Sequence, residues 1–296
     1  MERKLNINIP EAAFRFETLI ERILPKRIFY KLLLRGKGLE FDGYRDFAPD
    51  DDFSIIDWKA SIRANKYLTK QYVEERDIKI IFVIDVSDNM IFGSGKKLKC
   101  EHVAEIAGAL GRVLLNDPRD QFGYLFYSDD IVDMRMPEPG MKQYERFVYQ
   151  LSNPNIYGGK GNLKNALTKL MERIDSSISL IVIISDFLKI ERSALEILEN
   201  VTALIETIAI IVKDPLDFTF PEVDREVVIE NPETGERLLI NPKLAKSVYE
   251  HISKIKEKKV RRLLREAGVD NVKIVTNKDF CPRLAFFLKR RTTRRE

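Results

Sequence analysis

The chain has 296 residues, 44% of them hydrophobic and 32% charged, which is enough apolar content for one large or two modest domains. Its 50 Lys and Arg and 46 Asp and Glu leave a net charge of +4, a balance that does not by itself indicate a nucleic-acid partner. Two isolated cysteines argue against a disulfide framework, and no apolar run is long enough to cross a membrane, so we expect a cytoplasmic protein.

The first 76 residues are predicted to form an N-terminal extension. Apolar positions at helical spacing predict a helix over residues 11–35, with an interruption at Pro25. Residues 36–66 contain several glycines and an acidic run and are predicted to be irregular. An edge strand is expected at 67–73.

Residues 77–296 are predicted to form one α/β domain. Strands are expected at 78–84, 121–127, 130–135, 178–185, 205–212 and 272–275, and helices at 97–115, 140–151, 162–174, 190–202, 242–266 and the C-terminus. Residues 227–240 predict a β-hairpin insertion. Alternating strands and helices indicate a doubly wound, mostly parallel sheet, which binds ligands at the carboxyl ends of its strands.

Motifs of nucleotide binding and nucleophilic catalysis are absent from the sequence. The stretch Gly93–Lys97 differs from a phosphate-binding loop, because Met90 stands where the first glycine is needed and Lys97 where a hydroxyl is needed. The sequence also lacks a G-x-S-x-G elbow and an H-E-x-x-H motif. A metal-dependent hydrolase would require a water-activating base that the sequence does not identify. We therefore predict a protein that is not an enzyme.

Polar residues follow two predicted strands where a ligand site is expected. Asp85, Ser87 and Asn89 alternate after the first strand of the domain, and Asp186 follows its most apolar strand. Carboxylate, hydroxyl and amide oxygens suit Mg²⁺ or Mn²⁺. The alternative is that these side chains cap a helix and satisfy turn amides, and spacing alone favours that alternative.

Together with the glycine-rich loop 158–162, these residues resemble the metal-ion-dependent adhesion site of von Willebrand factor A domains. Residues 41–52 and 56–63 further resemble the signature of the DUF58 family, and 120–128 resemble its second strand. The resemblance extends from about residue 35 to the end of the chain. It implies a von Willebrand factor A-like fold and an adaptor or chaperone-like partner of MoxR-type AAA+ ATPases.

The resemblance also implies a metal site for Mg²⁺ or Mn²⁺ at Asp85, Ser87, Asn89 and Asp186. The site is expected to be weakened, since Asn89 stands where the family has Ser. Gly161, with Asn162 beside it, stands where the family has a metal-binding Thr.

Two further surfaces are candidates for partner binding. The first comprises Gly161 and Asn162 with an upstream cluster of Arg45, Asp52, Asp57, Trp58 and Arg63. A structural interpretation of that cluster is favoured, in which Trp58 anchors the segment and the two arginines pair with the two aspartates. The second surface, the basic C-terminal tail with the helix Lys254–Arg265, supports an alternative function in nucleic-acid binding.

Overall fold

The computed structural model describes residues 4–23, 40–48, 51, 56–73, 78–115, 118–188, 190–230 and 235–293. Contacts divide the chain into two compact units. The main unit comprises Met1–Leu34 with Ile78–Glu296, and the small unit comprises Arg35–Asp77. The expected extension of residues 1–76 is therefore divided between the two units.

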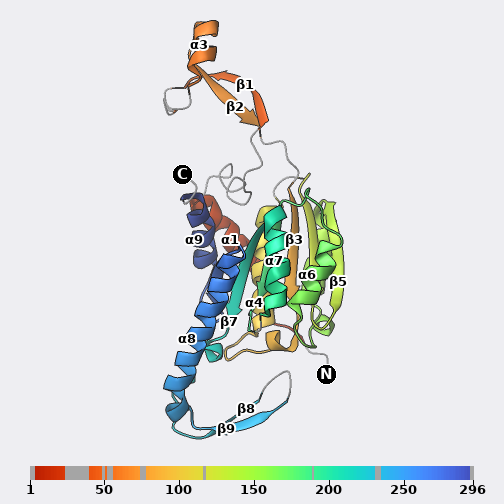
Figure 1. Cartoon of the computed structure of the whole chain (residues 1–296), viewed down its shortest axis with the longest axis vertical. Coiled ribbons are helices and arrows are strands. Elements are labelled where there is room, and N and C mark those ends of the chain that lie inside the picture. Colours follow the sequence, from red (N-terminus) through yellow and green to blue (C-terminus); the bar gives the residue numbers. More distant parts are fainter. Residues whose placement is uncertain are drawn as a thin grey trace. The chain divides into compact units, whose positions relative to one another are not determined.

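The main unit alternates strands and helices in the predicted order (Figure 1). Its elements are α1 (Ile9–Ile23), β3 (Lys79–Asp85), η2 (Asp88–Met90), α4 (Lys99–Leu114), β4 (Gln121–Tyr127), β5 (Ile131–Pro139), α5 (Met141–Leu151), η3 (Pro154–Ile156), α6 (Leu163–Met171), β6 (Leu180–Ser185), α7 (Arg192–Leu204), β7 (Glu206–Lys213), η4 (Pro215–Asp217), β8 (Val227–Glu230), β9 (Arg237–Ile240), α8 (Pro242–Glu266), β10 (Asp270–Val275) and α9 (Phe280–Thr293).

The six-stranded sheet of the main unit has the order β10-β7-β6-β3-β4-β5. All neighbouring strands are parallel except β4 and β5, which form an antiparallel pair. The first strand of this sheet, β3, lies in its middle. The next two strands, β4 and β5, follow on one side of β3, and the later strands β6, β7 and β10 follow on the other side. This order is doubly wound, with its switch point between β3 and β6, so the predicted fold class is confirmed.

Helices cover both faces of this sheet, because alternate side chains of each central strand point to opposite faces. Ile80, Phe82 and Ile84 pack in one buried cluster with residues of α1, α4, α5 and α9. Ile81 and Val83 pack in a second cluster with residues of α6, α7 and α8. The central strands are therefore buried on both faces, as their nearly continuous apolar sequence predicts.

Helix α1 is part of the main unit, where it packs on α4 and α9. Its Phe16 is fully buried and lies 6.1 Å from the Phe280 ring, between ring centroids. A Cβ atom on Gly108 of α4 would lie 2.5 Å from Cγ2 of Ile9, so a larger residue at position 108 would require the Ile9 side chain to shift. Just before the helix, the Asn8 amide donates to a buried carboxylate of α4, that of Glu105 (2.8 Å).

The small unit consists of an antiparallel pair, β1 (Glu40–Asp46) and β2 (Leu68–Val73), with α3 (Trp58–Ala64) between them in sequence. The prediction of an irregular segment at 36–66 is wrong for β1 and α3. Strand β1 has no regular apolar alternation, and its register shifts at Gly43. Helix α3 has only seven residues, too few for a helical period to show, and its signal is the capping residue Asp57.

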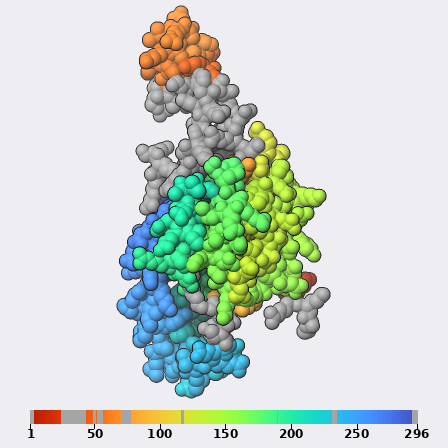
Figure 2. Space-filling view, turned by 45° about the vertical axis from the view of Figure 1, so that its right-hand side comes forward, coloured from red at the N-terminus to blue at the C-terminus, as the bar shows by residue number. Residues whose placement is uncertain are grey.

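The predicted β-hairpin is confirmed as β8 and β9, which form a two-stranded sheet in the described part of the chain. Together with the first turns of α8, this hairpin projects from one end of the main unit (Figures 1 and 2). Among the residues that the structure describes, no helix is both long and apolar enough to span a membrane.

Candidate functional site

The switch point of the sheet places two polar strand ends beside each other. Strands β3 and β6 are parallel neighbours, with Ile84 paired to Ile184, so Asp85 and Ser185 follow at the same edge. The Ser185 hydroxyl donates a hydrogen bond to Oδ2 of Asp85 at 2.8 Å. Two residues separated by 100 positions in the sequence thus form one buried contact.

Asp85 is a buried carboxylate with partners on both oxygens. Its Oδ1 accepts a hydrogen bond from the Ser87 amide at 3.0 Å, and only 5% of the residue is exposed. The pKa of Asp85 is raised to about 6, mainly by burial and also by the charge of Asp186, although the hydrogen bonds from the Ser87 amide and the Ser185 hydroxyl lower it. A second acid therefore lies close enough to Asp85 to disfavour its ionised form.

Ser87 presents a hydroxyl that is fully buried and has no hydrogen-bond partner among the described residues. This hydroxyl does not cap η2, so the capping interpretation does not account for it. A Cβ atom on the exposed Gly161 would lie 3.3 Å from Oγ of Ser87 and 3.5 Å from Oδ2 of Asp85. Because Gly161 has no side chain, Oγ of Ser87 and Oδ2 of Asp85 lie directly beneath the exposed loop.

Asp186 is held by a lysine that the sequence analysis did not identify. Nζ of Lys99 lies 2.7 Å from Oδ2 of Asp186 and 3.4 Å from Oδ2 of Asp217. The Lys99 side chain is 1% exposed. Burial alone would lower the pKa of Lys99, but Asp186 and Asp217 raise it above its ordinary value. A permanent positive charge therefore lies against the predicted metal ligand Asp186.

The two remaining predicted residues of this site have different positions. Asn89 is half-buried on η2. The Asn162 side chain accepts a hydrogen bond from the Asn165 amide at 3.0 Å and caps α6. In the described part of the chain, no three His, Cys, Asp or Glu side chains converge to hold a metal ion. Any cation here therefore depends on hydroxyl, amide or water ligands as well as on Asp85.

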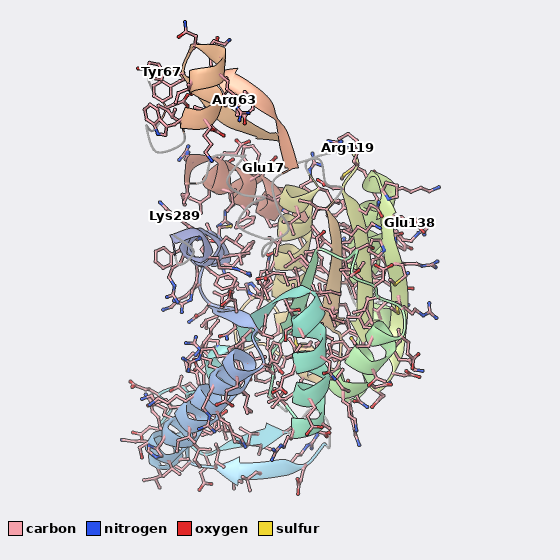
Figure 3. The ribbon with its side chains drawn as sticks, turned by 45° about the horizontal axis from the view of Figure 1, so that its top comes forward. Glu17, Arg63, Tyr67, Arg119, Glu138 and Lys289 are labelled. Atoms are coloured by element: carbon pink, nitrogen blue, oxygen red, sulfur yellow. The ribbon has the colours of Figure 1, made fainter. Side chains whose placement is uncertain are left out.

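The upstream cluster lies in the small unit. Arg45 forms a bidentate pair with Asp51, whereas Asp52 lies outside the described residues. Asp57 caps α3 by accepting from the Ala60 amide at 3.1 Å. Figure 3 shows Arg63 on α3 and Tyr67 just before β2.

Trp58 is 58% exposed, and its ring makes an edge contact with the ring of Tyr67, itself 62% exposed. Ile62 on the same helix is 80% exposed. The small unit thus presents large apolar side chains to its surface, a feature of binding surfaces.

The basic C-terminal region is only partly available to a ligand. Arg291 is buried and pairs with Glu206, and it also lies 3.4 Å from Oδ2 of Asp270. It therefore anchors α9 to the sheet instead of facing solvent. Arg294 and Arg295 lie outside the described residues.

Lys99 and Ser185 complete this site, although neither is among its predicted metal ligands. Ser185 precedes Asp186 at a strand end, so its position carried a usable signal. Lys99 follows Lys96 and Lys97 at a predicted helix start, where a lysine normally lies in solvent. Its burial depends on carboxylates 87 and 118 positions away, and no local pattern predicts such contacts.

Comparison with known proteins shows which family the sequence of this chain matches. The sequence profile described as "Protein of unknown function DUF58" matches residues 43–260, more than half of the chain. Uncharacterised proteins of Mycobacterium bovis and Mycobacterium tuberculosis are 25% identical over 264 residues, covering 88% of this chain and 81% of theirs.

Solved structures match this chain at low sequence identity and with TM-scores of 0.33 to 0.44. A conserved hypothetical protein, BatB, of Bacteroides thetaiotaomicron is 13% identical and has a TM-score of 0.44, with 73% of this chain and 99% of that chain covered. The von Willebrand factor A domain of SpRpn10 is 12% identical with a TM-score of 0.34, covering 45% and 74%. The ArnB paralogue VWA2 of Sulfolobus acidocaldarius is 19% identical with a TM-score of 0.33, covering 49% and 37%.

Proposed function

The chain belongs to the DUF58 family of proteins of unknown function, and on this basis we propose that it is a non-enzymatic interaction module that works with a MoxR-type AAA+ ATPase. The exposed aromatic surface of the small unit is the observation that carries this proposal. That surface comprises Tyr44, Trp58, Ile62 and Tyr67, each between 46% and 80% exposed. Apolar and aromatic side chains of this kind supply most of the binding free energy at protein interfaces. Because such a partner consumes ATP, we place the encounter in the cytoplasm.

The loops above the buried site form a separate candidate partner surface on the main unit. Asp85, Ser87 and Asp186 are too buried to meet a partner directly. Gly161 and Asn162 are exposed above them, and Ser94–Lys96 are exposed in another loop of the main unit. A partner would therefore contact the loops, while the buried polar groups hold those loops in place.

The test of this function is binding to a purified MoxR-type AAA+ ATPase from the source cell, with ATP and Mg²⁺ present. Tyr67→Ala removes a 62% exposed ring of the proposed surface, and we expect it to weaken binding at least tenfold. Tyr149→Ala removes a 72% exposed ring on α5 and serves as the matched control. Equal binding by both variants, or no binding by the unaltered protein, would contradict the proposal.

Within this function we propose a divalent cation, Mg²⁺ or Mn²⁺, at the buried strand ends. The Asp85 carboxylate and the unpartnered Ser87 hydroxyl fit such a hard cation, with Asn89, Asp186 and water to complete its shell. The cation would supply positive charge that fixes the loop and coordinates a partner's oxygen. Lys99 opposes it, since its ammonium already neutralises Asp186.

Thermal unfolding with and without metal tests the cation separately from the partner. We expect millimolar Mg²⁺ or Mn²⁺ to raise the melting temperature, and Asp85→Ala to abolish the rise. An unchanged melting temperature in the unaltered protein would remove the cation from the proposal and leave the interaction surface to its own test.

A further inference from the structure

Helix α8 exposes an apolar stripe that nothing in the described chain covers. Leu244, Val248, Ile252 and Ile255 are 78%, 60%, 45% and 55% exposed. Their spacing of four, four and three residues places them on one face of the helix. The opposite face packs on the main unit through Leu264, which is fully buried. One helix thus has two apolar faces, and among the described residues only one of these faces has a partner.

The neighbouring β8–β9 hairpin is equally uncovered. Val228 faces Leu239 and Ile229 faces Leu238 across the two strands, and three of these four side chains are about 60% exposed. A two-stranded hairpin is marginally stable in water without a third strand or a packed helix. The hairpin would therefore be stabilised by an apolar surface, and the described residues of its own unit do not provide one.

The two elements carry opposite charge. Helix α8 contains nine Lys and Arg and three Glu, and its Lys254, Lys258 and Lys259 form no salt bridge with any described residue. We call residues 221–240, which include the hairpin, the arm; it contains six acidic and two basic residues. The apolar stripe thus lies among positive charges, and the apolar hairpin among negative ones.

The positive charge of α8 and the negative charge of the arm indicate which kind of partner could cover the apolar stripe. Two α8 helices would repel each other, because both are strongly basic. An anionic lipid surface would attract α8 but repel the acidic arm next to it. Between described residues, the arm of the same chain forms ion pairs with α8 near its first turns, where Asp224 pairs with Lys243 and Glu222 with Lys246. An acidic, apolar arm from another copy fits the rest of the stripe.

We propose that two copies of this chain form a symmetric dimer in which the arm of each copy covers the α8 stripe of the other. Each copy offers both an arm and a stripe, so a two-fold axis satisfies both contacts at once and closes the assembly. This interface lies on elements separate from the aromatic surface of the small unit. It is therefore independent of the proposed ATPase partner.

Charge reversal tests the dimer directly, because the two contacts are identical. The arm variant is Glu226→Lys with Glu236→Lys, and the helix variant is Lys258→Glu with Lys259→Glu. Each variant alone places like charges at both contacts, and we expect its dimer dissociation constant to rise about 10- to 100-fold. A mixture of the two variants restores opposite charges at both contacts, so we expect it to form heterodimers.

Sedimentation equilibrium over a range of concentrations and salt provides the measurement. Lys142→Glu with Lys164→Glu, exposed residues on α5 and α6, is the matched control and should dimerise like the unaltered protein. The proposal is overturned if the unaltered protein stays monomeric up to about 1 mM, the weak end of specific association. It is equally overturned if both reversed variants still dimerise, or if their mixture stays monomeric.

Discussion

The ammonium of Lys99 lies 2.7 Å from the carboxylate of Asp186, and both side chains are almost completely buried. Burial removes both charges from solvent, so each is stabilised by the opposite charges next to it. In the metal site that the family resemblance implies, a divalent cation would neutralise this aspartate. Here a side chain of the protein supplies positive charge at the same carboxylate.

The first prediction follows from this pair. Lys99→Met removes the ammonium and leaves Asp186 and Asp217 as buried acids without it, so we expect a loss of about 3–5 kcal/mol in the free energy of unfolding. Urea unfolding followed by circular dichroism measures this loss. Adding Asp186→Asn to Lys99→Met should recover part of the stability, because one uncompensated charge is removed. If the double variant is no more stable than Lys99→Met, the Lys99–Asp186 pair is not the cause of the lost stability.

A second prediction concerns the missing side chain at Gly161. Gly161→Ser introduces a hydroxyl close to the Ser87 hydroxyl and the Asp85 carboxylate, and so adds a third oxygen ligand. We expect Mg²⁺ or Mn²⁺ to raise the melting temperature of this variant more than that of the unaltered protein.

Gly161→Ala is the matched control, because it brings the same Cβ atom at 3.3 Å from Ser87 Oγ without the hydroxyl. Both variants should therefore lose the same stability from fitting the added Cβ atom. Only the serine variant should show a larger rise of melting temperature with metal than the unaltered protein. An equal response of the two variants to metal would exclude Gly161 as the weak point of the site.

Much of this site was predictable from the sequence, because parallel strands bring their carboxyl ends to one edge. Asp85 ends β3 and Asp186 follows β6, so the sequence pattern predicted both as strand-end residues, whereas their grouping in one site was predicted from the resemblance to von Willebrand factor A domains. The Lys99 ammonium was not predictable, since a lysine at a helix start normally lies in solvent. The docking of α1 was also not predictable, because its apolar period shows that it has a buried face but not which surface covers that face.

The third prediction is a pH dependence of stability. The pKa of Asp85 in the folded state, about 6, lies above its ordinary value of 3.8. The folded protein therefore binds this proton more tightly than the unfolded chain does. The resulting stabilisation is complete below about pH 4 and is lost as the pH rises through about 6.

Asp85→Asn removes this titration and provides the comparison. We expect the stability of the unaltered protein relative to the variant to fall by roughly 2–3 kcal/mol between pH 4 and pH 7. Urea unfolding of both proteins at several pH values, with a chelator present to exclude metal, measures the difference. A difference that stays constant over this range would show that Asp85 does not retain its proton in the folded state.

The last prediction uses Trp58, the single tryptophan of the chain, as a reporter of the small unit. Asp57 caps the helix that starts at Trp58, so Asp57→Ala should destabilise the small unit by about 1 kcal/mol. Asp57→Asn keeps an oxygen that can accept from the Ala60 amide and should retain most of that stability.

The midpoint of urea unfolding followed by tryptophan fluorescence should therefore be lower for Asp57→Ala than for the unaltered protein. Far-UV circular dichroism, which reports mainly on the larger unit, should change little. Equal shifts of both signals would mean that the two units unfold as one.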